Sequence, residues 1–262
     1  MRAGYLQFSP ARSDVPFNLR FIEASLEKAG ADLVVLPELA LTGYLFASRE
    51  ALERVAEPVP GPSTERLAGL CRREGLSIVC GMAEKSRGKV YNAAVVVGPD
   101  GVVGTYRKSH LFSSEKALFD PGDSGFLVFD VAGARVGVLV CFDWIFPEAS
   151  RTLALAGADI IAHPANLVLP FAQSAVVTRC LENRVFWILA NRTGEETEGE
   201  THRAFTGKSR IAAPWGEVLV QSDASATCLA AAAIDPLKAR DKHATPENDL
   251  FADRRTDLYR VR

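Results

Sequence analysis

The sequence lacks a strong charge of either sign and any long apolar run. Its 262 residues carry 30 Lys and Arg against 32 Asp and Glu, a formal net charge of −2. Such a balance gives no field suited to DNA or to an anionic membrane surface, so we expect no nucleic-acid partner. Charged residues at Arg2, Arg12, Asp14 and Arg20 interrupt the amino-terminal region, which predicts neither a signal peptide nor a membrane span. We therefore expect a cytoplasmic protein.

The sequence also lacks paired cysteines and closely spaced metal ligands. Its 5 cysteines are odd in number and widely spread, which argues against a disulfide framework; they are Cys71, Cys80, Cys141, Cys180 and Cys228. The 4 histidines are equally scattered, and no Cys-x-x-Cys or His-x-x-x-His pattern occurs. The sequence therefore predicts no metal site and no cofactor.

What the chain does contain is an alternation of strand and helix patterns. Strands are expected at residues 5–8, 32–36, 76–83, 90–97, 102–106, 126–131, 134–140, 159–162, 185–190, 209–213, 217–221 and 227–234. Helices are expected at residues 18–28, 63–73, 147–155 and 171–183, the second capped by Ser63. Two segments, 107–125 and 191–206, read as irregular.

These elements predict an α/β protein with two mixed sheets. No linker rich in Gly, Ser or Pro divides the chain, so we expect one domain over residues 1–262. Each sheet would carry helices on its outer face, which gives a four-layer α-β-β-α sandwich. A single doubly wound sheet is the alternative, and it is less attractive because one open sheet rarely holds so many strands.

Three reactive side chains follow directly after expected strands. Glu38 comes just past the strand at 32–36, Lys108 past 102–106 and Cys141 past 134–140. Side chains at such strand ends meet at the edge where α/β proteins place their chemistry. A thiol near its ordinary pKa is mostly protonated, so nucleophilic catalysis by Cys141 needs a cation or a carboxylate base beside it. Lys108 and Glu38 can supply these groups.

The residues around these positions resemble the signature motifs of a known family. The segments Leu36–Leu39 (LPEL), Tyr106–Phe112 (YRKSHLF) and Val140–Glu148 (VCFDWIFPE) are similar to the three motifs of the nitrilase, or carbon–nitrogen hydrolase, superfamily. The resemblance continues through later stretches of the chain, at His163–Leu167, Glu182–Arg184, Gly207–Ser209 and Arg254–Arg255. Within the superfamily, the chain looks closest to the short archaeal-type nitrilases.

The resemblance implies a catalytic role for several residues. It makes Cys141 the nucleophile, Glu38 the general base and later acid, and Lys108 the group that stabilises developing negative charge. The backbone N–H of Phe142 would be a second oxyanion donor, and Glu115 would lie beside the lysine. The implied reaction is hydrolysis of a small amide or nitrile to ammonia and a carboxylic acid, through a cysteine thioester or thioimidate. No catalytic role is expected for Asp143 or His163.

Substrate contacts are expected from side chains that flank the mouth of the site: Tyr44, Trp144, Asn166 and Phe171. Many relatives have Arg at the position of Ile145, and its loss removes a possible clamp for a substrate carboxylate. Small neutral or apolar amides or nitriles are therefore favoured. An N-carbamoyl amidohydrolase is the alternative enzyme, and a non-catalytic scaffold with the same fold is the alternative class.

The charged tail at residues 236–262 carries apolar residues that are unusual for a free end, among them Leu250, Phe251, Leu258 and Tyr259. Members of the superfamily pair beside the nucleophile helix and use the tail across the interface. The resemblance thus implies a homodimer with this tail at the interface, and a tail folded back on its own subunit is the alternative.

Overall fold

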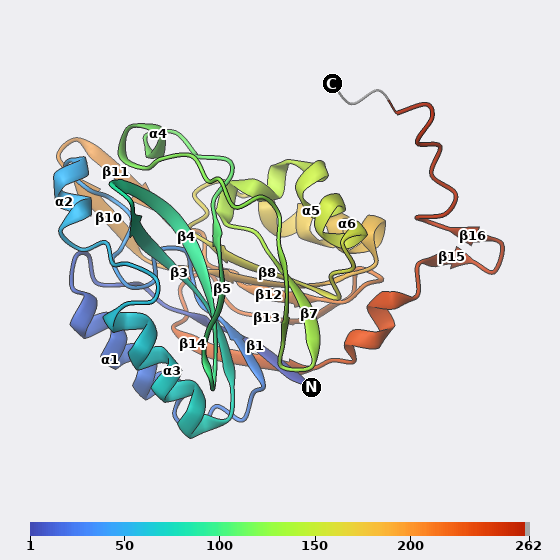
Figure 1. Cartoon of the computed structure of the whole chain (residues 1–262), viewed down its shortest axis with the longest axis horizontal. Helices are drawn as coiled ribbons and strands as arrows, with labels where there is room; N and C mark the ends of the chain where they lie inside the picture. Colours follow the sequence, from blue (N-terminus) through green and yellow to red (C-terminus); the bar gives the residue numbers. More distant parts are fainter. Residues whose placement is uncertain (260–262) are drawn as a thin grey trace.

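Two six-stranded sheets pack face to face in the computed structural model, which describes residues 1–259 (Figure 1). The first sheet has the order β14 (Cys228–Ala233), β1 (Arg2–Gln7), β2 (Leu33–Val35), β3 (Ser77–Ser86), β4 (Lys89–Gly98) and β5 (Gly101–Arg107). The second has the order β13 (Val218–Gln221), β12 (Arg210–Ala212), β9 (Phe186–Asn191), β8 (Ile160–Ala165), β7 (Ala134–Val138) and β6 (Val128–Val131).

Helices cover the outer face of each sheet. Helices α1 (Val15–Leu26) and α3 (Pro62–Glu74) lie on the first sheet, and α5 (Pro147–Leu155) and α6 (Ala172–Asn183) lie on the second (Figure 1). In each sheet three neighbouring strands are parallel, β1 to β3 and β7 to β9, and the remaining pairings are antiparallel. The predicted four-layer sandwich of two mixed sheets is confirmed, and the single doubly wound sheet is wrong.

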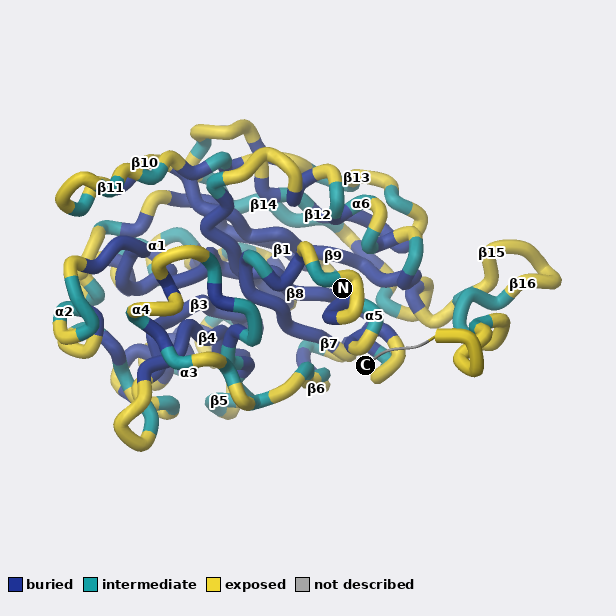
Figure 2. The backbone as a smooth tube through the Cα atoms, turned by 90° about the horizontal axis from the view of Figure 1, so that it is seen from above, coloured by how far each residue is buried: buried dark blue, intermediate teal, exposed yellow. Residues whose placement is uncertain are grey.

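The continuous apolar runs of the sequence follow from burial of both faces of each sheet. In β2, Leu33 and Val35 belong to the core between the sheets, whereas Val34 packs under α1 and α3. Successive side chains of a strand point to opposite faces, so a sheet with apolar neighbours on both faces needs apolar residues at every position. The inner strands, among them β1, β8 and β9, form the buried centre of the molecule in Figure 2.

Two local predictions were wrong. Helix α3 begins one residue before Ser63, with Gly61 as its N-cap and the hydroxyl of Thr64 accepting the Gly61 N–H at 2.8 Å. Ser63 instead donates its hydroxyl to the Glu57 carboxylate at 2.8 Å. The supposedly irregular segment 191–206 contains a hairpin of β10 (Glu195–Glu198) and β11 (Thr201–Ala204). Its strands are polar and lack the apolar alternation that identifies a half-buried strand.

The remaining elements are short. They are α2 (Arg49–Glu53), α4 (Glu115–Leu118), the 3₁₀ helices η1 (Cys141–Ile145) and η2 (Pro236–Arg240), and a hairpin of β15 (His243–Thr245) and β16 (Asn248–Asp249). Residues 241–259, after η2, project from the sandwich and are largely exposed (Figures 1 and 2). The last positions of the expected interface tail, 260–262, lie outside the described residues. Among residues 1–259, no helix has the length and apolarity needed to cross a bilayer.

Candidate active site

Glu38 lies in the interior, where its backbone crosses closely over the backbone of strand β3. After β2, the Pro37–Glu38 backbone passes over Gly81 of β3, where an added Cβ would lie 2.4 Å from the Pro37 carbonyl oxygen and 2.5 Å from Glu38 Cα. The Glu38 side chain is fully buried. Its Oε1 accepts hydrogen bonds from Asn92 Nδ2 and Lys108 Nζ, both at 2.7 Å. Its Oε2 has no protein partner and is available to a reacting group.

Lys108 follows β5 and places its ammonium between two carboxylates. Nζ lies 2.7 Å from Glu38 Oε1 and 2.8 Å from Glu115 Oε2, and the side chain is 0% exposed. Gly122 donates its N–H to the Lys108 carbonyl at 3.0 Å, and a Cβ there would lie 2.6 Å from that oxygen. The backbone is thus held so closely that only glycine fits. Burial and two ion pairs fix the ammonium in one place.

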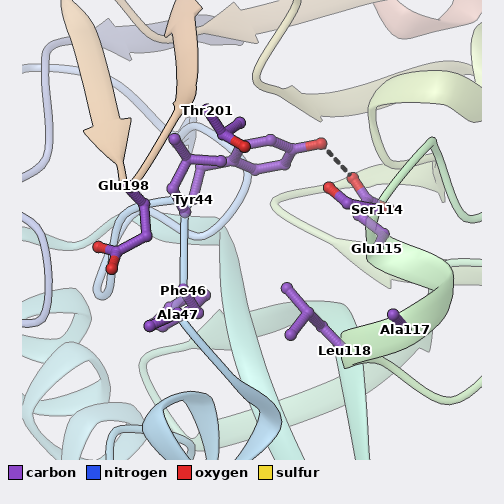
Figure 3. A pocket seen from close by; sticks show the side chains of 11 residues that line it. Tyr44, Phe46, Ala47, Ser114, Glu115, Ala117, Leu118, Glu198 and Thr201 are labelled. Atoms are coloured by element: carbon purple, nitrogen blue, oxygen red, sulfur yellow. Dashed lines mark hydrogen bonds between the residues drawn. The ribbon is translucent and has the colours of Figure 1, made fainter.

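Glu115 opens helix α4 and connects Lys108 to Tyr44. Its Oε1 accepts the Tyr44 hydroxyl at 2.8 Å, and its Oε2 accepts the Phe112 N–H at 3.1 Å. In Figure 3 the Tyr44 ring points toward Glu115, and the dashed line marks their hydrogen bond. These bonds leave Glu115 little freedom, so it orients Lys108.

The Tyr44 loop is itself fixed by a buried ion pair. The Glu196 carboxylate accepts the backbone N–H groups of Tyr44 and Leu45, the latter at 2.7 Å, and it pairs with buried Arg192. A charge-assisted pair of this kind is strong when buried and hydrogen-bonded on both sides. The β10–β11 hairpin, which carries Glu196, thereby holds the loop that positions Glu115 through Tyr44.

Cys141 begins the 3₁₀ helix η1 at the corner after β7. Its backbone has a φ of +43°, and its side chain is buried with 6% exposure. The corner is tied to the lysine segment by Asp143, whose carboxylate accepts the Val140 N–H at 2.9 Å, the Tyr106 hydroxyl at 2.8 Å and the His110 N–H at 3.1 Å. Asp143 therefore has a structural role between the two segments.

Two hollows adjoin these groups. A narrow cavity of about 20 Å³ is lined by Phe112, Cys141, Phe142, Trp144, Asn166, Leu167, Val168 and Leu169. A second, of about 390 Å³, opens beyond Tyr44 and Glu115 toward the β10–β11 hairpin (Figure 3). The structure thus brings Trp144 and Asn166 to the thiol and Tyr44 to Glu115. Phe171 lines neither hollow, and it is 61% exposed before α6.

A family model described as carbon–nitrogen hydrolase matches residues 2–243. The chain belongs to the carbon–nitrogen hydrolase family. It is 46% identical to a nitrilase of Pyrococcus abyssi over 99% of both chains. It is 33% identical to an N-carbamoylputrescine amidase of Solanum lycopersicum, over 98% of this chain and 92% of that one.

The solved structures support the same family assignment. A mutant amidase of Nesterenkonia sp. AN1 superposes with a TM-score of 0.80 at 25% identity, covering 98% of this chain and 95% of that one. That structure is described as showing covalent addition of the acetamide moiety of fluoroacetamide at the active site cysteine. The resemblance of the sequence motifs to the nitrilase superfamily is confirmed.

The pKa values of the three central groups of the site are shifted by burial and by the charges of their neighbours. Burial raises the pKa of Glu38, and the effect prevails over the opposing charge of Lys108. Burial lowers the pKa of Lys108, but the carboxylates of Glu115 and Glu38 outweigh it and raise that pKa well above its ordinary value. Burial, followed by the Glu38 charge, raises the pKa of the Cys141 thiol well above its ordinary value. The resting site therefore holds a neutral thiol beside a fixed ammonium.

Sequence reasoning missed two residues of this site that contact or support the central groups. Asn92 donates a hydrogen bond to Glu38 from the apolar strand β4. A single polar residue within an apolar strand is the sequence feature that could have identified it. Glu196, which holds the Tyr44 loop, lies in the polar hairpin that read as irregular. Within residues 1–259, no group of three or more His, Cys, Asp or Glu side chains is arranged to hold a metal ion.

Proposed function

We propose that this carbon–nitrogen hydrolase cleaves the carbon–nitrogen bond of a small amide or nitrile with Cys141 as nucleophile. The observation that carries the proposal is the fully buried Lys108 ammonium, 2.7 Å from Glu38 and 2.8 Å from Glu115, whose charge acts on the buried Cys141 thiol. The two carboxylates hold the ammonium in place, where it can stabilise a developing oxyanion. One carboxylate oxygen, Glu38 Oε2, has no protein partner and can accept a proton.

In the first half of the reaction, Glu38 takes the thiol proton as Cys141 Sγ forms a bond to the substrate carbonyl carbon. The raised pKa of the thiol makes this base necessary, because little thiolate exists beforehand. The carbonyl π electrons move to oxygen, where Lys108 Nζ and the Phe142 N–H stabilise the charge. Re-formation of the carbonyl then breaks the C–N bond, and Glu38 returns its proton to the departing nitrogen. Ammonia is released, and the acyl group remains on Cys141 as a thioester.

In the second half, Glu38 removes a proton from water, which attacks the thioester carbonyl. The oxyanion again lies at Lys108 and Phe142, and collapse breaks the C–S bond. The thiolate recovers the proton from Glu38, and the carboxylic acid departs. With a nitrile, attack gives a thioimidate, and addition of water precedes the loss of ammonia. One carboxylate thus serves as base and acid in both halves.

The lining of the narrow cavity favours a small acyl group. Phe112, Trp144 and Leu167 are apolar, and the amide NH2 group and the carbonyl oxygen of Asn166 have no protein partner. Ile145, where many relatives have Arg, is 42% exposed and does not line the cavity. A neutral substrate fits this surface better than a dicarboxylic monoamide.

An N-carbamoyl compound is the second candidate, because the free Asn166 amide can pair with the extra N–H of a carbamoyl group. The likeness to an N-carbamoylputrescine amidase is compatible with this substrate. Asn166→Leu separates the candidates. It removes the polar pair while keeping the size of the side chain, so it should raise KM for a carbamoyl substrate far more than for the matched simple amide.

The experiment that tests the function is an ammonia-release screen over amides, nitriles and carbamoyl compounds that share one acyl chain. Wild-type protein should release ammonia from one class, and Cys141→Ala should release none while its melting temperature changes little. Cys141→Ser should be nearly inactive, since a hydroxyl is a far weaker acid. Ammonia release by Cys141→Ala would contradict the assignment of the nucleophile, and a wild type inactive on every class would favour the scaffold.

We also propose that residues 1–262 act as one domain and that the protein is a homodimer with tail 236–262 at its interface. The apolar side chains left exposed along that tail, Leu237, Leu258 and Tyr259, support the second proposal.

A further inference from the structure

His163 of β8 has no place in the reaction above, yet it contacts the nucleophile corner. The ring is fully buried. Its Nε2 lies 2.9 Å from the Cys141 carbonyl oxygen, and its Nδ1 lies 3.1 Å from Trp187 Nε1 of β9. A buried histidine with both nitrogens engaged is held in a single orientation.

The two partners of His163 fix its tautomer. A carbonyl oxygen only accepts, so Nε2 carries the proton that is donated to Cys141. An indole N–H only donates, so Nδ1 is bare and accepts from Trp187. Burial lowers the pKa of His163 to about 4, which keeps the ring neutral near neutral pH. The ring is therefore a fixed donor to one carbonyl.

That carbonyl belongs to the same peptide unit as the Phe142 N–H. The unit is planar and trans, so its C=O and N–H point in opposite directions and rotate together. The first hydrogen bond of η1 runs from the Asp143 N–H to the Val140 carbonyl at 3.1 Å. The Phe142 N–H comes one residue earlier in the chain and takes no part in the hydrogen bonds of this helix. It is thus free to bind substrate, and its direction depends on what holds the Cys141 carbonyl.

The Cys141 backbone needs such a restraint. Its φ of +43° lies in the left-handed region, which L-residues with a Cβ disfavour. A strained residue keeps its conformation only where the surroundings over-determine it. The hydrogen bond from His163 is a restraint placed directly on the peptide unit in question. A hydrogen bond to the carbonyl also polarises the unit and strengthens its N–H as a donor.

We propose that His163 is a positioning residue that aims the Phe142 N–H at the oxyanion by holding the Cys141 carbonyl. The inference rests on the proposed function. Removal of this donor should lower kcat and leave KM nearly unchanged, because the oxyanion exists only after attack. It should also leave alkylation of the thiol unchanged, since that displacement forms no oxyanion.

The test compares variants that keep or lose the donor. Trp187→Phe keeps the His163 ring and is the control. The double variant His163→Phe, Trp187→Phe lacks the donor to Cys141. It also lacks the Trp187 indole N–H, which would be buried without an acceptor once His163 is replaced. His163→Gln restores an N–H donor and an acceptor in similar positions. His163→Leu is a second donor-free variant.

All variants carry Cys228→Ser. Among the free cysteines of residues 1–259, Cys228 is the partly exposed one, and its alkylation would add to the measured alkylation of Cys141.

For the amide that wild type hydrolyses best, we expect kcat of the double variant to fall on the order of tenfold to a hundredfold below Trp187→Phe, a loss smaller than deletion of an oxyanion donor. KM and the rate of Cys141 alkylation by iodoacetamide should each stay within about twofold. His163→Gln should recover most of the turnover.

Equal kcat in the donor-free variants and the Trp187→Phe control would overturn the proposal. So would a parallel loss of alkylation, which would mean that His163 acts through the thiol. If both donor-free variants fail to fold while His163→Gln folds and is active, the hydrogen bond belongs to folding, and the proposal is again overturned. Failure of the proposed function is distinguishable, because it would leave the wild type itself without ammonia release.

Discussion

At the scale of single residues, the site depends on the compact charge of Lys108. One ammonium contacts carboxylates from two different segments, Glu38 after β2 and Glu115 in α4, with no solvent access. Breaking a buried pair of this kind by removing one member leaves an uncompensated charge and costs about 3–5 kcal/mol. The shape of the cation therefore matters as well as its sign.

We predict that Lys108→Arg will not rescue the activity lost in Lys108→Ala. Arginine keeps the charge but replaces a point-like ammonium by a planar fork, which cannot reach both carboxylates and leave the thiol uncrowded. Both variants should lose at least about a hundredfold in kcat/KM, as expected when an oxyanion donor is removed. Steady-state kinetics measure the loss. Near-normal kinetics for Lys108→Arg would mean that positive charge suffices at this position.

A second residue-scale prediction concerns the pH dependence of stability. The pKa of His163 is lowered from 6.5 to about 4 in the folded protein, so the unfolded chain binds the proton more readily between these values. The contribution of His163 to the free energy of unfolding is therefore fully present above pH 6.5, and it is lost as the pH falls toward 4. Between pH 7 and pH 5 this one group should cost about 2 kcal/mol of unfolding free energy.

Urea unfolding of wild type and His163→Gln at the two pH values measures this contribution. Glutamine does not titrate, so the variant should lose about 2 kcal/mol less than wild type between pH 7 and pH 5. The other buried carboxylates titrate in both proteins and cancel in the difference. An identical pH dependence in both proteins would show that His163 is not the group responsible.

At the scale of elements, each reactive residue stands at the end of a strand that its neighbours hold in place. The crossing at Gly81 brings Glu38 over β3, Gly122 holds the Lys108 backbone, and Asp143 ties the Cys141 corner to the segment after β5. A displacement of about 1 Å at a reacting group can cost about a hundredfold in rate. The backbone contacts behind the site should thus matter as much as the side chains in it.

We predict that Gly81→Ala lowers both stability and turnover. The new Cβ meets backbone atoms of Pro37 and Glu38 at 2.4 and 2.5 Å, and backbone cannot rotate away as a side chain does. Overpacking of this kind costs about 1–3 kcal/mol, and displacement of Glu38 should reduce kcat by at least about tenfold. Melting temperature and ammonia release measure the two effects.

Gly69→Ala in helix α3 is the matched control. Its added Cβ finds only the Arg73 Nη1 atom, at 3.7 Å, so there is no clash. Alanine in a helix interior stabilises by about 0.5–1 kcal/mol relative to glycine. The control should therefore gain stability and keep full turnover. If both variants behave alike, the crossing at Gly81 does not position Glu38.

At the scale of the whole molecule, the two sheets form a closed interior, while the chain after η2 lies outside it (Figure 1). Phe251 returns to the body, where its ring lies 5.1 Å from the Arg151 guanidinium and 4.9 Å from Lys242 Nζ. Leu258 and Tyr259, farther along, are 62% and 55% exposed. Part of the tail thus packs on its own subunit, whereas Leu258 and Tyr259 remain largely exposed.

We predict that deletion of residues 248–262 shifts the protein from dimer to monomer. The exposed apolar residues at the end of the tail would be covered by a second copy, and closed twofold dimers are the commonest assembly. Light scattering over a concentration series gives the mass. Phe251→Ala is the control, since it removes only the contact within one subunit and should stay dimeric. A truncated protein that keeps the dimer mass would show that the tail is not required.

By itself, the sequence predicted most strands and helices of the two sheets, the two-sheet sandwich, and the positions of Glu38, Lys108 and Cys141 just past their strands. These follow from local patterns: apolar runs that need two buried faces, a proline that opens the α5 helix, and reactive residues directly after strands. Helix α5 begins and ends where the pattern predicts, at Pro147 and Leu155. Such features depend on residues that are close together in the chain, so the sequence alone is enough to predict them.

Tertiary structure alone decided what depends on neighbours from distant segments. Desolvation outweighs the Lys108 charge at Glu38, and Asn92 reaches Glu38 from another strand. Phe171 is exposed and lines neither hollow. The contact of His163 with the Cys141 carbonyl joins residues 22 positions apart. A pKa, a hydrogen-bond partner and a cavity wall are each set by distances in space, and only the packed fold fixes those distances.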